Sequence, residues 1–288
     1  MKKGFIYLIG AVTIWSISSG LIIPLIKLSS FVFYGIGSFF SLIFLLLILA
    51  FKKHLNRSFK YPRKIVFFMA LIGLGTAINN GLFFTGLKAG SVANAALTHY
   101  LGPVFVAFIF APLILREKLT LKTFFLVILS FLGLLILMLP TLQTSFDLAI
   151  LYGSLSAIFF ALFVVIEKKV TQMETDALTT VFYISLVPFI LFGPLAIGDI
   201  MNGITVHEWL LLALWGILVP GISFTLFFEG IKRVSATSAS ILGYGEPLGA
   251  IILAFIFFKQ PINVYIIIGG FLIILSGILI VKKPKLKT

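Results

Sequence analysis

Glu246 is the residue whose setting most clearly suggests chemistry, because it lies inside a largely apolar run between Ser235 and Lys259. It is about eleven residues from the nearer polar flank, so in a membrane-spanning helix it falls near the bilayer midplane. A carboxyl group at that depth is costly and is usually functional, and it could bind an amine or carry a proton. The alternative is a structural acid held by a donor on a neighbouring helix, such as Tyr100 or Asn80.

Other polar and aromatic groups lie at comparable depths in other apolar runs. His99 could relay a proton with Glu246, or it could donate one hydrogen bond to a facing helix and do nothing more. Asn79 and Asn80 are adjacent and diverge by about 100° on a helix, so at least one of them must face a partner or a cavity. Trp15 lies midway along the first run, where its indole N–H needs an acceptor, so we expect it to face a cavity.

Tyr100 and Tyr244 are two further candidates, since they could either enclose a substrate between their rings or pack an interface between two halves of the chain. Pro103 and Pro247 each follow one of these tyrosines by three positions. Each proline frees a backbone carbonyl near the midplane, which either bends the helix around a binding site or is simply tolerated there.

The sequence holds no residue set typical of an enzyme. It contains no cysteine and no HExxH motif, which excludes disulfides, thiolate nucleophiles and cysteine metal sites. We therefore expect no catalytic residue, no metal site and no cofactor. Glu167 and Glu229 lie beside basic residues at helix ends, where pairing at the membrane interface explains them.

Composition places these residues in a membrane protein. Hydrophobic residues make up 60% of the chain, the mean hydropathy is +1.20, and only 11% of residues are charged. A soluble globule of 288 residues could not bury so much apolar surface. The net charge of +13 does not indicate nucleic acid binding, because the basic residues form short clusters between apolar runs, as topology signals do.

Ten apolar runs are long enough to cross a bilayer as helices. The runs are continuous rather than alternating, and lipid requires backbone groups to pair within each segment, so we expect helices rather than strands. The expected spans are residues 4–26, 31–51, 64–87, 92–115, 121–139, 148–168, 177–198, 208–230, 236–258 and 262–281.

Lysine and arginine are distributed unevenly between the loops. If the N-terminus is cytoplasmic, all of the 22 except Lys27, Lys88 and Lys259 lie on the cytoplasmic side. This bias predicts a multi-pass protein of the cell membrane, with both termini in the cytoplasm and an even number of spans.

An internal repeat relates the two halves. A shift of 144 positions aligns Leu82–Pro103 with Leu226–Pro247, and the identical pairs include Gly, Lys, Ser, Tyr and Pro. Five helices per half is an odd number, so the two copies would enter the membrane from opposite faces. We expect an all-α polytopic membrane protein with ten transmembrane helices in two inverted five-helix repeats, residues 1–142 and 143–288. Such repeats often serve alternating access, although a duplicated scaffold without transport is the alternative.

Two segments carry a family resemblance, HYLGPVFVAFIFAPLILREKLT at residues 99–120 and GYGEPLGAIILAFIFFKQPIN at residues 243–263. With ten helices in two halves, they resemble the EamA-type transporters of the drug/metabolite transporter superfamily over nearly the whole chain. The resemblance implies a central cavity between the halves.

It also aligns the family's Glu-Pro pair with Glu246 and Pro247, and its loop glutamate with Glu117. The second half has Lys259-Gln260-Pro261 where a glutamate is common, so no role carries over to that loop.

The resemblance and the repeat together predict a secondary active transporter, which we expect to export a small metabolite such as an amino acid by alternating access. The expected partners are this small-molecule substrate, the lipid bilayer and coupling protons at Glu246, with no nucleic acid, and the chain is either a monomer or a homodimer. One alternative is an uncoupled exchanger or facilitator. Another is an intramembrane enzyme on lipid-linked substrates, with Glu246 and His99 as acid and base.

Overall fold

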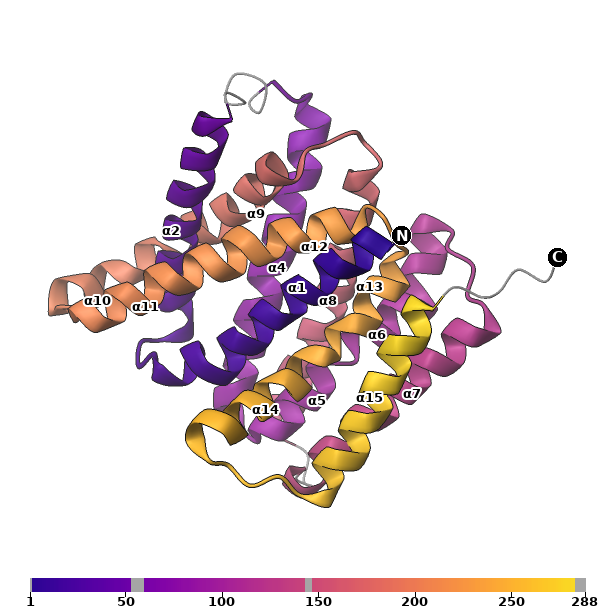
Figure 1. Ribbon diagram of the computed structural model, residues 1–288. Coiled ribbons are helices and arrows are strands. Elements are labelled where there is room, and N and C mark those ends of the chain that lie inside the picture. The colour runs from indigo at the N-terminus through magenta and orange to yellow at the C-terminus, as the bar shows by residue number, and fades with distance from the viewer. Residues whose placement is uncertain (1, 53–59, 143–146, 283–288) are drawn as a thin grey trace.

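The computed structural model describes residues 2–52, 60–142 and 147–282. Within these ranges every regular element is a helix, and the helices form an antiparallel bundle (Figure 1). The described residues contain nine helices long and apolar enough to cross a membrane, and a tenth if one bent pair is counted as a span. The prediction of an all-α, polytopic membrane protein is confirmed.

The first five spans lie within residues 2–141. They are formed by α1 (Lys2–Ile17), η1 (Ser18–Ile22) and η2 (Ile23–Leu25); α2 (Ser30–Phe51); α4 (Arg63–Ala89); α5 (Val92–His99), α6 (Gly102–Phe105) and η3 (Val106–Leu115); and α7 (Leu121–Met138) with η4 (Leu139–Thr141).

The last five spans follow from residue 148. They are formed by α8 (Leu148–Thr171); α9 (Ala177–Phe192), η5 (Pro194–Ala196) and α10 (Ile197–Asn202); α11 (Val206–Gly216), η6 (Ile217–Ser223) and α12 (Phe224–Ile231); α13 (Ala236–Gly243) and α14 (Gly245–Phe258); and α15 (Val264–Val281). The seventh span is the bent pair, since its two parts meet at 45°. Pro194 lies at this break, where it cannot donate the backbone hydrogen bond that a straight helix needs.

Short polar side chains begin most of the spans. Each accepts a hydrogen bond from a backbone amide in the first helical turn, which would otherwise lack a partner. These capping residues are Ser29, Ser91, Thr120, Asp147, Asp176, Thr205, Ser235 and Asn263.

Residues that are 144 positions apart meet at two places in the bundle. The hydroxyl oxygens of Ser41 and Ser185 lie 3.0 Å apart, and the Tyr244 hydroxyl donates to the backbone carbonyl of Tyr100 at 2.9 Å. This spacing equals the shift that aligns the two halves of the sequence. Corresponding spans also pack on each other, α2 against α9 and α7 against α15.

The beginning of the first span and the end of the last span lie at one end of the bundle. Gly4 lies against Arg233, and the Lys122 ammonium donates to the backbone carbonyl of Lys282 at 2.9 Å. Both of these contacts involve the basic loops that the charge distribution assigns to one side of the membrane. Some members of that basic set lie outside the described residues, namely Lys53, Arg57, Lys283, Lys285 and Lys287.

Candidate functional site

A cavity of about 140 Å³ lies between spans from both halves of the chain. Its polar lining groups, apart from the aromatic ones and His99, are Ser18, Ser19, Thr76, Asn79, Asn80 and Glu246. Its aromatic lining residues are Trp15, Tyr34, Phe83, Phe84, Tyr100, Phe160, Phe163, Trp215 and Phe224. The first, second, third, fourth, sixth, eighth and ninth spans all contribute to it.

The Glu246 carboxyl group lies at this cavity and is held by the first and fourth spans. The Ser19 hydroxyl donates to Glu246 Oε1 at 3.1 Å. The Tyr100 side chain also interacts with the carboxyl group. Of the two donors that the sequence suggests, Tyr100 is therefore near Glu246, whereas the serine was not foreseen.

A break in the ninth span positions this carboxyl group. Here α13 ends at Gly243 and α14 begins at Gly245, with Tyr244 between them. Glu246 lies in the first turn of α14, where unpaired backbone N–H groups favour a negative charge. Pro247 follows in the same turn, and its ring cannot donate a hydrogen bond back across the break.

The fourth span has the matching interruption. There α5 ends at His99, and α6 begins at Gly102 with Pro103 in its first turn. Tyr100 lies in the break, and its ring centroid is 6.3 Å from that of Tyr244. The two breaks therefore face each other across the halves.

Tyr244 and Tyr100 differ in their exposure to the cavity. The Tyr244 side chain is fully buried and packs in an apolar cluster with Leu134, Leu248 and Ile273. Tyr100 lines the cavity. The two residues thus meet at the interface, and only Tyr100 offers its ring to a ligand in this conformation.

His99 and Asn79 share one partner on the sixth span. The distance from His99 Nδ1 to the Ser156 hydroxyl is 2.8 Å, and the Asn79 amide donates to the Ser156 backbone carbonyl at 2.8 Å. The imidazole stacks on Phe83 with centroids 4.2 Å apart. Both residues line the cavity, but these bonds orient them toward α8 rather than toward Glu246.

Asn80 is also engaged within the first half. Its amide donates to the Tyr34 hydroxyl at 3.1 Å and to the Thr76 backbone carbonyl at 3.0 Å. The structure therefore assigns the donor role at Glu246 to other residues. Asn80 instead orients the Tyr34 ring at the cavity wall.

Two tryptophans of the wall join the first and eighth spans through reciprocal hydrogen bonds. The Trp15 indole N–H donates to the Ser223 hydroxyl at 2.7 Å, and that of Trp215 donates to the Ser18 hydroxyl at 2.9 Å. Trp215 is 3% exposed. Trp215 also packs in a buried apolar cluster, and it was not identified from the sequence as a cavity residue, although the serines beside Trp15 were a usable signal.

The two glutamates expected to pair at helix ends behave differently. Glu229 forms an ion pair with Arg233. Glu167 is only 4% exposed, and Lys168 binds the backbone carbonyls of Ile231 and Val234 instead. The expectation of interfacial pairing is therefore wrong for Glu167, which lines a narrow hollow of about 20 Å³ beside the cavity.

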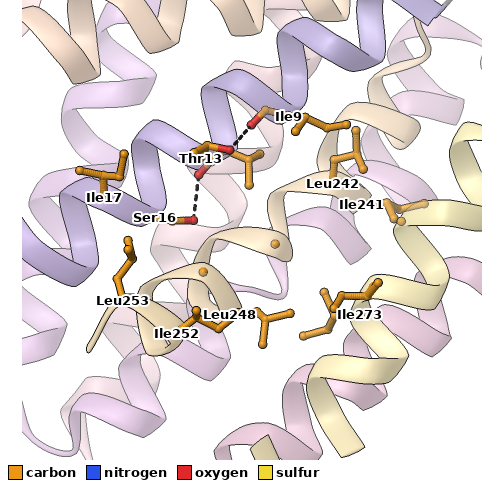
Figure 2. A pocket seen from close by; sticks show the side chains of 15 residues that line it. Ile9, Thr13, Ser16, Ile17, Ile241, Leu242, Leu248, Ile252, Leu253 and Ile273 are labelled. Carbon is orange, nitrogen blue, oxygen red and sulfur yellow. Dashed lines mark hydrogen bonds between the residues drawn. The ribbon is translucent and has the colours of Figure 1, made fainter. Parts of the chain in front are cut away.

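A larger hollow of about 440 Å³ lies between α1, α13, α14 and α15. Figure 2 shows that isoleucines and leucines form most of its wall. Its two hydroxyl groups, on Thr13 and Ser16, donate to carbonyls of their own helix at 2.8 and 2.9 Å. This hollow offers no group for proton or charge chemistry, so the smaller polar cavity is the candidate site.

No group of three or more metal-ligating side chains occurs among the residues that the structure describes. The groups that line the cavity are one carboxyl group, an imidazole, phenols, aliphatic hydroxyls, amides, indoles and aromatic faces.

Comparison with known proteins identifies similar chains. The EamA-like transporter family matches residues 2–139 and 147–282. An uncharacterized transporter of Archaeoglobus fulgidus is 28% identical over 217 residues, which cover 72% of this chain and 74% of that protein.

Two relatives have names that state a substrate. An S-adenosylmethionine uptake transporter of Rickettsia prowazekii is 28% identical over 69% of this chain and 66% of its own length. A pseudopaline exporter of Pseudomonas aeruginosa is 26% identical over 70% of each chain. A solved structure titled "Crystal structure of protein" has the same fold, with a TM-score of 0.81, 16% identity and 97% of each chain covered.

Proposed function

Since the chain belongs to the EamA-like transporter family, we propose that it is a secondary active transporter that moves a small metabolite, such as an amino acid, across the cell membrane. The observation that carries this proposal is the cavity that holds Glu246 between spans of both halves. Transporters place their substrate sites at such a midplane position between repeats.

The mechanism in this proposal is alternating access by two inverted repeats. Its support is the meeting of equivalent residues, Ser41 with Ser185 and Tyr100 with Tyr244. If a two-fold axis relates the two halves, a residue can contact its equivalent in the other half only when both lie near that axis. The breaks before Pro103 and Pro247 are the hinges of this mechanism, because the regular α-helical hydrogen-bond pattern of the fourth and ninth spans is interrupted there.

In the same proposal, Glu246 carries the coupling proton. Its carboxyl group reaches the cavity and binds Ser19, so a proton or a cationic group that arrives there changes this contact. Export is the proposed direction. We also propose that both termini lie in the cytoplasm. This is supported by the basic loops at the end of the bundle where the first span begins and the last span ends.

The test uses purified protein in liposomes. A thermal-shift screen against amino acids, nucleosides and sugar phosphates first identifies ligands, because a molecule that binds the native state stabilises it. Uptake of each ligand is then measured with and without an imposed pH gradient.

We expect Glu246→Gln to abolish gradient-driven uptake while the protein stays folded. The matched control is Glu174→Gln, which makes the same chemical change at an exposed turn residue outside the cavity. Transport by the Gln variant that equals wild type and ignores pH would eliminate proton coupling and leave an uncoupled exchanger or facilitator. No transport of any ligand by the wild-type protein would overturn the proposal itself.

A further inference from the structure

We propose that the cavity binds a compact organic cation, a quaternary or protonated ammonium or a sulfonium head group, between aromatic rings and the Glu246 carboxylate. This inference rests on the proposed function and names the substrate class of the same site, in place of the amino acid that served there as an example, because an amino acid carries a carboxylate. It follows from four properties of the cavity: its charge, its few free hydrogen-bond donors, its aromatic walls and its size.

The charge of the cavity favours a positive ligand. Glu246 is its acidic lining residue, and no lysine or arginine is among the described residues that line it. An anionic ligand would have no cation to pair with and would lie near a carboxylate in a medium of low dielectric constant. A cationic ligand would supply the missing counter-charge.

The hydrogen-bond donors of the cavity are mostly in use. The indole N–H groups of Trp15 and Trp215 bind serine hydroxyls, and the Asn80 amide binds Tyr34 and Thr76. A ligand carboxylate or phosphate needs several donors aimed at it. The Trp and Asn donors are already committed within the protein.

Aromatic rings are the surface that remains. Nine of the described residues around the cavity are Phe, Tyr or Trp. The Tyr34 ring contacts Trp215 with centroids 5.5 Å apart, and the Trp15 ring contacts Phe224 at 6.5 Å. The face of such a ring attracts a cation, most strongly when water is excluded, and cages of rings recognise quaternary ammonium groups.

The size of the cavity restricts the head group. Its volume of about 140 Å³ is close to that of an engineered protein cavity of about 150 Å³ that binds benzene. A trimethylammonium or dimethylsulfonium group has a comparable bulk. A nucleotide or a sugar phosphate is too large for this volume, and its negative charge disfavours it as well.

The experiment compares choline with 3,3-dimethyl-1-butanol, which has the same shape but carries carbon in place of the charged nitrogen. Binding to the full-length, detergent-purified protein is measured by calorimetry and by the fluorescence of the tryptophans, two of which line the cavity. We expect choline to bind and the neutral alcohol to bind at least tenfold more weakly. Equal binding of the two, or no binding of choline at about 50 mM, which is about 50 times a Kd of 1 mM, would overturn the inference.

Two variants locate the binding. Glu246→Gln is expected to weaken choline binding at least tenfold, while Glu174→Gln leaves it unchanged. If Glu246→Gln does not fold, Phe224→Leu provides the second measurement, because it removes a ring without removing a hydrogen-bonding group. That variant should weaken choline several-fold and leave the binding of the alcohol nearly unchanged. A parallel loss of both ligands would indicate apolar packing instead of cation recognition.

The outcome separates this inference from the proposed function. Choline binding is measured in detergent and requires no transport. Transport of neutral or anionic ligands without any binding of choline would overturn only the cation site. Choline binding without uptake of any cation into liposomes would overturn only the transporter.

Discussion

Glu117 lies in the loop between the fourth and fifth spans, and its carboxylate binds the beginning of α13 in the other half of the chain. Oε1 accepts from the Ala236 amide at 2.9 Å, and Oε2 accepts from the amide and the hydroxyl of Thr237 at 3.4 and 3.3 Å. Ser235 accepts from the Ser238 amide in the same turn. The carboxylate and Ser235 together satisfy the first amides of this helix.

The cost of removing this carboxylate follows from the burial of its donors. Ala236 is 0% exposed and Thr237 is 5% exposed, so water cannot fully replace the lost acceptor. An ordinary helix cap contributes about 1 kcal/mol, and a buried donor without a partner costs about 1–3 kcal/mol. We therefore expect Glu117→Ala to lower the free energy of unfolding by about 2 kcal/mol.

The change is measurable as a melting temperature. At about 2.1 cal/mol/K of unfolding entropy per residue, a chain of 288 residues loses roughly 3 °C for 2 kcal/mol. Glu117→Gln keeps one acceptor oxygen, so it should lose roughly half as much. Glu174→Gln, at an exposed turn, should not change the melting temperature. A shift below about 1 °C for Glu117→Ala would refute the argument that this contact holds the two halves together.

Two further predictions concern packing and topology. A methyl group on Gly133 would lie 2.8 Å from the Gly269 carbonyl oxygen, so Gly133→Ala should destabilise the α7–α15 contact by about 1–3 kcal/mol. The control is Gly277→Ala on α15, where the nearest atom is 3.7 Å away, and it should be neutral or stabilising. Equal effects of the two substitutions on stability would contradict this prediction. The chain has no native cysteine, so a cysteine replacing Lys259 should react with an impermeant maleimide added outside cells. A cysteine replacing Lys118 should not, and the reverse result would invert the orientation.

The positions of the spans were predictable because the bilayer imposes them. Predicted residues 92–115 and 236–258 match the fourth and ninth spans as observed. A run of about 20 apolar residues between polar flanks has no other arrangement that pairs its backbone in lipid. The bend of the seventh span was not predicted, because it depends on how Gly193 and Pro194 meet their neighbours. Gly35 on α2 lies directly against the backbone of Phe192 and Gly193 at this bend.

The cavity wall was only partly predictable, since apolar spans do not reveal which face is turned inward. On α2, Tyr34 is 2% exposed and lines the cavity, whereas Phe39 on the same helix is 41% exposed. Both are aromatic, and the weak signal that distinguishes their faces is Ser38 and Ser41, which follow Tyr34 by four and seven positions and are buried with it. The inward face is decided by packing against helices distant in sequence. Polar residues such as Asn79 and Glu246 were found because lipid disfavours them anywhere else.

The two interpretations of Glu246, structural acid and functional group, describe the same contacts. Its oxygen accepts from Ser19 on the first span, and its side chain interacts with Tyr100 on the fourth, while Glu246 itself belongs to the ninth. The carboxyl group thus joins two spans of the first half to one of the second. A ligand that takes over this carboxylate must compete with Ser19 and Tyr100, so binding necessarily alters a contact between the halves. We expect this competition to link occupancy of the cavity to the relative position of the repeats.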